Sequence, residues 1–92
     1  MFNELISIMN IFYNGNTRTY KEIDVYTLNN HNGRVQNNLN FSDERFSLLM
    51  EILMKNDIVE INSITEYRPN PTYSLTTKGI FAKENNSLQL LP

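Results

Sequence analysis

The side chains of this chain that could do acid–base or metal chemistry stand apart from one another. His31 is the only histidine, and it lies in an Asn- and Gly-rich stretch without a cysteine. Metal binding and proton transfer both need partner groups, which this stretch does not supply. Asp43 and Glu44 are adjacent and would point about 100° apart on a helix, which suits capping better than paired acid–base work.

The remaining candidate groups also lack partners. Ser42 and Ser47 have no neighbouring base, and the three glycines do not form a phosphate-binding pattern. The chain has no cysteine, which excludes a disulfide framework and a cysteine-based zinc site. We therefore expect a protein that is not an enzyme and that carries no catalytic residue, metal or cofactor.

Length and composition favour one small folded domain. The chain has 92 residues, 40% of them apolar, which predicts a single domain over 1–92 with a tail at 85–92. No apolar run approaches the ~20 residues of a membrane span, and the N-terminus has no basic leader. We expect a soluble cytoplasmic protein without a membrane partner.

The charge is slightly acidic and uneven. The net charge is −2, and residues 42–60 hold five carboxylates against Arg45 and Lys55. A DNA-binding domain usually carries a basic stripe, and none is obvious here. Fifteen asparagines are scattered along the chain. This bias is typical of AT-rich coding sequences, including those of phages and mobile elements.

The N-terminal third predicts one helix and then an ambiguous stretch. Apolar residues at helical spacing favour a helix over about 4–14, with Asn3 as N-cap and Gly15 following its end. Residues 19–23 suit either a short helix or a strand. The composition of residues 29–33 indicates a loop, and 34–39 could add a helical turn. We interpret 24–41 as an insertion.

The C-terminal half is better defined. Ser42 can cap a helix over 42–55 that turns Phe46, Leu49, Met50 and Leu53 to one side, with Asn56 as a left-handed C-cap. A strand from Ile58 to Ile64, a Pro-containing turn and a return strand with Tyr73 and Leu75 follow. Thr76 or Thr77 then caps a short helix with Ile80 and Phe81, and Leu88, Leu90 and Leu91 of the tail are free to pack on the domain or a partner.

This order resembles the second half of a winged helix-turn-helix domain. Residues 39–60 are similar to a recognition helix followed by a wing, and Tyr73–Gly79 is similar to the wing exit of small MarR-like, PadR-like and YjcQ-like proteins of bacteria or phages. The resemblance implies an α+β winged helix of three to four helices with a β-hairpin wing. It also implies a cytoplasmic, dimeric transcription regulator that binds double-stranded DNA.

The resemblance places the DNA contacts on the wing and around the recognition helix. Arg68 and Asn70 at the wing tip could meet a minor groove or phosphates, although an exposed turn explains them equally well. The residues implied as DNA contacts are Arg18, Lys21, Arg34, Arg45, Arg68, Asn70 and Lys78.

The outward side of helix 42–55 favours a second hypothesis. It carries Glu44 and Glu51, which oppose phosphates, and the apolar residues Leu48 and Ile52. We expect something outside the main core to cover Leu48 and Ile52: a second copy, a host protein partner, or the 24–41 insertion. The alternative function is a winged-helix protein-interaction module, such as a phage effector acting on a host protein, that does not bind DNA.

Overall fold

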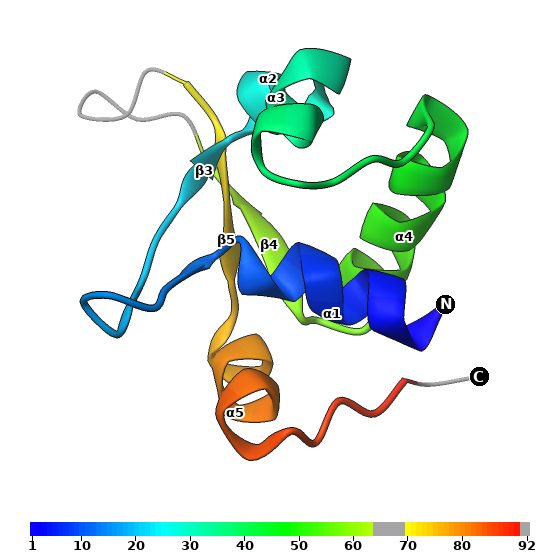
Figure 1. The fold of residues 1–92 in the computed structure, drawn as a ribbon. Helices are drawn as coiled ribbons and strands as arrows, with labels where there is room; N and C mark the ends of the chain where they lie inside the picture. The colour runs from blue at the N-terminus through cyan, green and yellow to red at the C-terminus, as the bar shows by residue number, and fades with distance from the viewer. Residues whose placement is uncertain (64–69, 91–92) are drawn as a thin grey trace.

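The computed structural model describes residues 1–63 and 70–90. In these ranges the chain forms five helices and five short strands (Figure 1). The elements are α1 (Phe2–Asn10), β1 (Tyr13–Asn14), β2 (Thr19–Tyr20), β3 (Ile23–Asp24), α2 (Val25–Asn29), α3 (His31–Gln36), α4 (Asp43–Lys55), β4 (Val59–Asn62), β5 (Thr72–Leu75) and α5 (Thr77–Asn85).

Two small antiparallel sheets organise the chain. β1 and β2 form a hairpin of their own, and β5 lies between β3 and β4 in the second sheet. Tyr73 of β5 is paired with Ile23 on one side and with Ile61 on the other, so the three side chains share one face of the sheet. The predicted α+β class is confirmed. Arg68 and Pro69 of the predicted turn lie outside the described residues.

Helix α4 forms as the sequence predicts. The Ser42 hydroxyl accepts a hydrogen bond from the Arg45 N–H at 3.1 Å, and the predicted apolar side is buried. The expected left-handed cap at Asn56 is wrong, because Asn56 has φ −91° and Asp57, one residue later, takes the left-handed φ of 59°. Asn56 instead donates its side-chain N–H to the Ile52 carbonyl and is buried.

Helix α1 is shorter than expected. It ends at Asn10 and not near residue 14, its N-cap is Met1 and not Asn3, and Gly15 lies in the loop of the β1–β2 hairpin. The reason is tertiary pairing. Tyr13 continues the helical spacing of apolar residues, but it pairs with Tyr20 across the hairpin instead. The 19–23 stretch accordingly forms strands, one of its two predicted states.

The stretch expected as a loop at 29–33 is part of two short helices. Asn30 caps α3 by accepting the Asn32 N–H at 2.8 Å, and Asp24 caps α2 in the same way. Gly33 is buried where α3 meets α2, and a Cβ there would lie 1.8 Å from the Thr27 carbonyl oxygen. Asn30 therefore acts as a helix cap, and Gly33 allows close contact between two helices, although both residue types are typical of loops.

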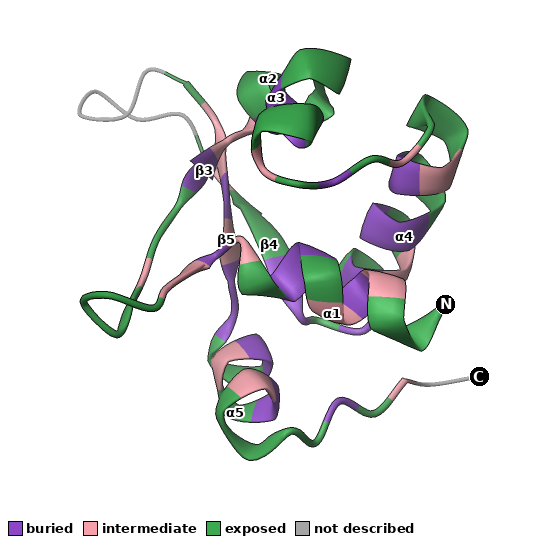
Figure 2. Ribbon diagram, in the orientation of Figure 1, coloured by how far each residue is buried: buried purple, intermediate pink, exposed green. Residues whose placement is uncertain are grey.

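The core lies between α1, α4 and the three-stranded sheet, with buried residues on the sides that face one another (Figure 2). Leu88 of the tail is buried in this core and Leu90 packs against it, while Leu91 lies outside the described residues. Thr76 caps α5, as one of the two predicted alternatives, by accepting the Gly79 N–H at 3.0 Å. Within the described ranges, no helix has the length and apolar character needed to cross a bilayer.

Leu49→Ala should destabilise the domain by about 2–5 kcal/mol, because Leu49 is fully buried in the core and the change leaves a cavity. Leu48→Ala, one residue earlier and 43% exposed, is the matched control and should change stability by less than about 0.5 kcal/mol. Urea unfolding followed by circular dichroism measures both. Equal effects of the two changes would contradict the packing of α4.

Candidate functional site

The expected DNA contact Arg34 is buried instead of lying on the surface. Its side chain is 1% exposed. The guanidinium donates Nη1–H to the Asn29 carbonyl oxygen at 2.7 Å and forms an ion pair with Asp43, the first residue of α4. The guanidinium carbon also lies 4.8 Å from the centre of the Phe46 ring. Arg34 thus joins the end of α2 to the start of α4, and its charge is not presented to a phosphate.

Arg45, another expected DNA contact, is held by α1. Its Nε–H and Nη2–H donate to the two carboxylate oxygens of Glu4 at 2.9 and 2.5 Å. This two-bond pair lowers the pKa of Glu4 to about 2, mainly through the Arg45 hydrogen bonds. The pair fixes the first turn of α4 on α1.

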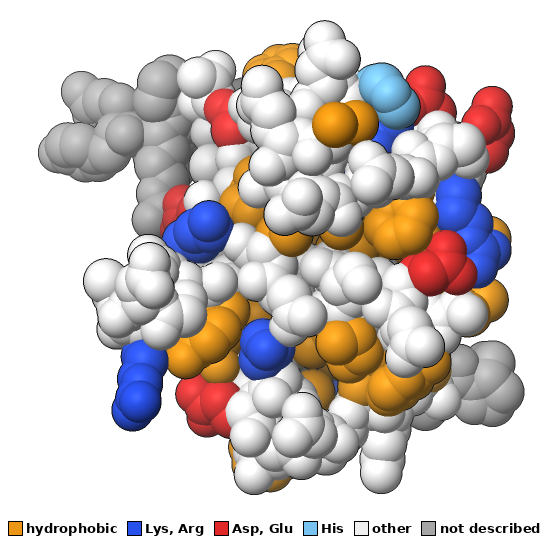
Figure 3. All heavy atoms as spheres, in the orientation of Figure 1, with side chains coloured by type: hydrophobic (Ala, Val, Ile, Leu, Met, Phe, Trp, Pro, Cys, Tyr) orange, Lys and Arg blue, Asp and Glu red, His pale blue; other side chains and the backbone are white. Residues whose placement is uncertain are grey.

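The other predicted cations lie on different elements. Arg18 and Lys21 are exposed on the β1–β2 hairpin and just after it, while Lys78 is on α5 and donates to the Asn56 carbonyl oxygen at 2.9 Å. Basic side chains at the left of Figure 3 are separated by white and orange surface from those at its right edge. Asn70 is exposed at the edge of the described residues. These residues are not brought together on one face with α4.

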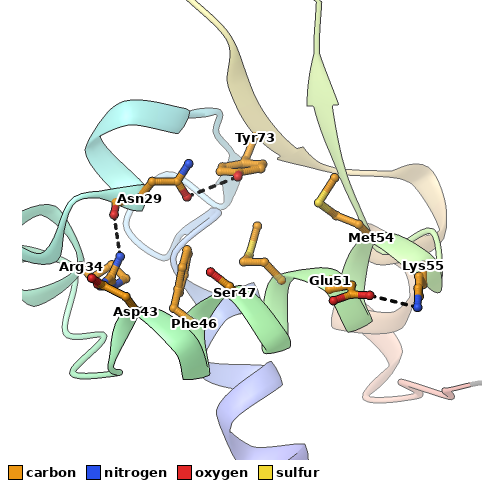
Figure 4. Close-up of a pocket in the computed structure, with 10 residues that line it drawn as sticks. Asn29, Arg34, Asp43, Phe46, Ser47, Glu51, Met54, Lys55 and Tyr73 are labelled. Carbon is orange, nitrogen blue, oxygen red and sulfur yellow. Dashed lines mark hydrogen bonds and ion pairs between the residues drawn. The ribbon is translucent and has the colours of Figure 1, made fainter.

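A groove of about 560 Å³ lies between α2, α3, α4 and β5 (Figure 4). Phe46, Met50 and Met54 of α4 and Tyr73 of β5 supply its apolar side chains. The Arg34–Asp43 ion pair stands at one end of α4, and the Glu51–Lys55 ion pair stands near the other. The groove thus has an apolar interior with charged groups at its rim.

Two polar groups line the groove beside its apolar side chains. The Tyr73 hydroxyl donates to the Asn29 side-chain oxygen at 3.4 Å, which leaves the amide nitrogen of Asn29 for another acceptor. Ser47 is exposed on the α4 side of the groove. An apolar hollow with a few convergent polar groups is the usual form of a binding site. No group of three or more His, Cys, Asp or Glu side chains suited to a metal occurs in residues 1–63 and 70–90.

The two predicted interface residues of α4 differ. Leu48 is 43% exposed, whereas Ile52 is partly buried against the main core, contrary to the expectation that something else covers it. Met54, which lines the groove, is 38% exposed, and Ile61, on the same sheet face as Tyr73, is 47% exposed. The apolar surface of α4 therefore includes Met54, which the sequence interpretation did not consider.

Sequence reasoning missed the groove because its residues come from four elements. Asn29 looked like part of a loop, and Tyr73 looked like an ordinary core residue of the return strand. The available signal was the spacing of Phe46, Met50 and Met54 at intervals of four, which lines one side of a helix.

Comparison of the chain with family models, with curated proteins and with solved structures finds no match.

Arg34→Met should lower the free energy of unfolding by about 1.5–3 kcal/mol, because it removes a charged donor from the Asn29 carbonyl and from Asp43. Lys55→Met is the matched control: it breaks the exposed pair with Glu51 and should cost about 0–1 kcal/mol. The loss of unfolding free energy for Arg34→Lys should lie between these two values. Lysine keeps the positive charge but lacks the planar guanidinium that donates to two acceptors at once. Chemical denaturation measures all three, and equal losses for Arg34→Met and Lys55→Met would contradict this role.

Glu4→Gln should remove a pH-dependent contribution to stability. Folding lowers the pKa of Glu4 from 4.5 to about 2, so the carboxylate stabilises the fold above pH 4.5 and loses that effect as the pH falls towards 2. The difference in unfolding free energy between the native protein and the variant should shrink as the pH falls from 4.5 to about 2. Arg45→Gln should show the same window in urea unfolding at a series of pH values. A difference that is constant from pH 7 to 2 would contradict the pair.

Proposed function

We propose that this domain is a winged-helix protein-interaction module that binds a partner protein at the groove beside α4 and does not use α4 to read DNA. The order of elements supports the winged-helix part. A helix and a short strand, β3, precede α2 and α3, and α4 is followed by the β4–β5 hairpin, whose second strand pairs with β3. This is the order that a winged helix requires, with the β1–β2 hairpin added after α1.

The observation that carries the proposal is the chemistry of the exposed side of α4. It presents Glu44 and Glu51 as carboxylates and Leu48 and Met54 as half-exposed apolar side chains. A helix in the major groove needs donors for base edges and cations for phosphates. Arg45 already forms an ion pair with Glu4, and Lys55 already forms an ion pair with Glu51. This side of α4 therefore suits a protein surface better than a nucleic acid.

The groove supports a protein partner in a second way. Its volume of about 560 Å³ falls within the 300–1,000 Å³ typical of binding sites, which accommodates one or two bulky side chains of a partner. Buried Phe46 and Met50 supply its base, and methionine adapts to apolar side chains of different shape. Asn29 and Ser47 supply hydrogen-bonding groups that would orient the partner backbone.

The test is selection of peptides from a random displayed library on the native protein, followed by affinity measurements with variants. Peptides with a bulky apolar residue should be enriched. Met54→Asp should weaken their binding about tenfold or more, which corresponds to about 1.4 kcal/mol, because it places a charge beside the apolar wall. Phe81→Asp is the matched control, because Phe81 is 63% exposed on α5, and it should leave the affinity unchanged.

A duplex titration tests the alternative that the domain is a DNA-binding regulator. Mixed-sequence duplex DNA at low salt should bind no more tightly to the double variant Glu44→Gln, Glu51→Gln than to the control Asp57→Asn, Glu60→Gln, which removes two exposed carboxylates outside α4. Tighter binding by the α4 variant than by this control would show that α4 faces phosphates and would overturn the proposal. Sedimentation of the native protein and of Leu48→Lys decides whether the partner is a second copy, since only a dimer would change mass.

A further inference from the structure

The β1–β2 hairpin carries a second surface, formed by elements other than α2, α4 and β5. The rings of Tyr13 and Tyr20 lie opposite each other with centres 5.3 Å apart and planes inclined by 44°. Both side chains are half-buried. The four-residue loop between the strands ends at Arg18, which takes the left-handed φ of 54°. Figure 3 shows basic side chains around an apolar area over this hairpin and α5.

Tyr13 stands between two hollows. The first, of about 380 Å³, is lined by Tyr13, Tyr20, Arg18, Lys83 and Glu84. In it the Lys83 ammonium lies 5.2 Å from the centre of the Tyr13 ring, and the Tyr20 hydroxyl donates to Glu84 at 3.3 Å. Two of the three other side chains, Lys83 and Glu84, thus already contact the aromatic pair.

The second hollow, of about 420 Å³, combines Tyr13 with a cation and side-chain amides. Lys21 lies in it together with Asn10, Gln36 and Asn38, all exposed. Amide groups donate and accept hydrogen bonds in the pattern that base edges require. The Tyr13 ring therefore borders both a basic aromatic hollow and a basic amide-rich hollow.

The charges of the two hollows are predominantly positive. Arg18, Lys21 and Lys83 face one carboxylate, Glu84, among the residues that line them. Glu22 follows Lys21 in the chain, and its carboxylate accepts from the Thr72 hydroxyl of the second sheet at 3.1 Å. Arg18 and Lys21 have no ion pair within the described ranges, in contrast to the cations of α4. This region can therefore attract an anion despite the net charge of −2.

We propose that the hairpin surface binds a short stretch of single-stranded nucleic acid. Bases stack on the Tyr13 and Tyr20 rings, the amides of the second hollow bind base edges, and Arg18 and Lys21 hold the phosphates. Aromatic stacking with a cationic border is the chemistry by which proteins bind unpaired strands. A duplex cannot use the rings, because its bases are already stacked on one another. The proposal does not depend on a protein partner at the α4 groove.

Fluorescence anisotropy with labelled oligomers of dT and of rU at low salt tests the proposal. Native protein should bind at least one of them. Tyr13→Ala should weaken binding roughly 5- to 150-fold, and Tyr13→Phe should preserve it, because stacking needs the ring and not the hydroxyl. Arg18→Gln and Lys21→Gln should each reduce the slope of log affinity against log salt by about 0.7.

Two variants on other elements are the controls. Tyr26→Ala removes a tyrosine that is 69% exposed on α2, and Lys55→Gln removes an exposed cation on α4; neither should change binding. Absence of binding at low salt, equal competition by a duplex of the same length, or equal losses for Tyr26→Ala and Tyr13→Ala would overturn the proposal. If Tyr13→Ala unfolds the hairpin, the Arg18 and Lys21 variants decide, and unchanged salt slopes would overturn it.

Discussion

The arrangement of this domain depends on the buried guanidinium of Arg34. It donates to the Asn29 carbonyl at the end of α2, pairs with Asp43 at the start of α4, and lies against the Phe46 ring. A buried charge is tolerated only where such partners replace water. The ends of two helices are consequently held on either side of one cation. Because Asn29, Asp43 and Phe46 also line the groove, the same interaction sets its width.

α2, which Arg34 joins to α4, and α3, which carries Arg34, are too short to persist alone. α2 has five residues and α3 has six, and isolated helices of this length are unstable in water. Their position is set by contacts instead: Asp24 and Asn30 cap them, and Gly33 allows α3 to approach the Thr27 carbonyl. The Nε of Arg34 has no hydrogen-bond partner in the described part of the chain, so this junction carries one unsatisfied donor as a cost of that geometry.

The elements that could be predicted are those whose signals lie within one segment of the sequence, and not those that depend on tertiary contacts. α4 and the β4–β5 pair were predicted because a Ser42 cap, a 3.6-residue spacing and β-branched strands act within one segment. α3 was predicted only in part, as a helical turn over 34–39, because the roles of Asn30 as a cap and of Gly33 as a close contact depend on the neighbouring α2. Arg34 was predicted at the surface, since an arginine in a polar stretch usually lies there. The groove was missed because it exists only once four elements, α2, α3, α4 and β5, meet.

The orientation of α4 follows from two ion pairs in its first turn. Asp43 is held by Arg34 of α3, and Arg45 is held by Glu4 of α1, so opposite sides of the same turn are anchored to different helices. A helix fixed in this way cannot rotate to present other residues without breaking one of the pairs. Ser47, Leu48 and Glu51 therefore stay on the outside. The cations that perform this anchoring are not available to phosphates, whereas those on the hairpin remain exposed. The two surfaces thus differ in charge because one set of cations is used to build the fold and the other is not.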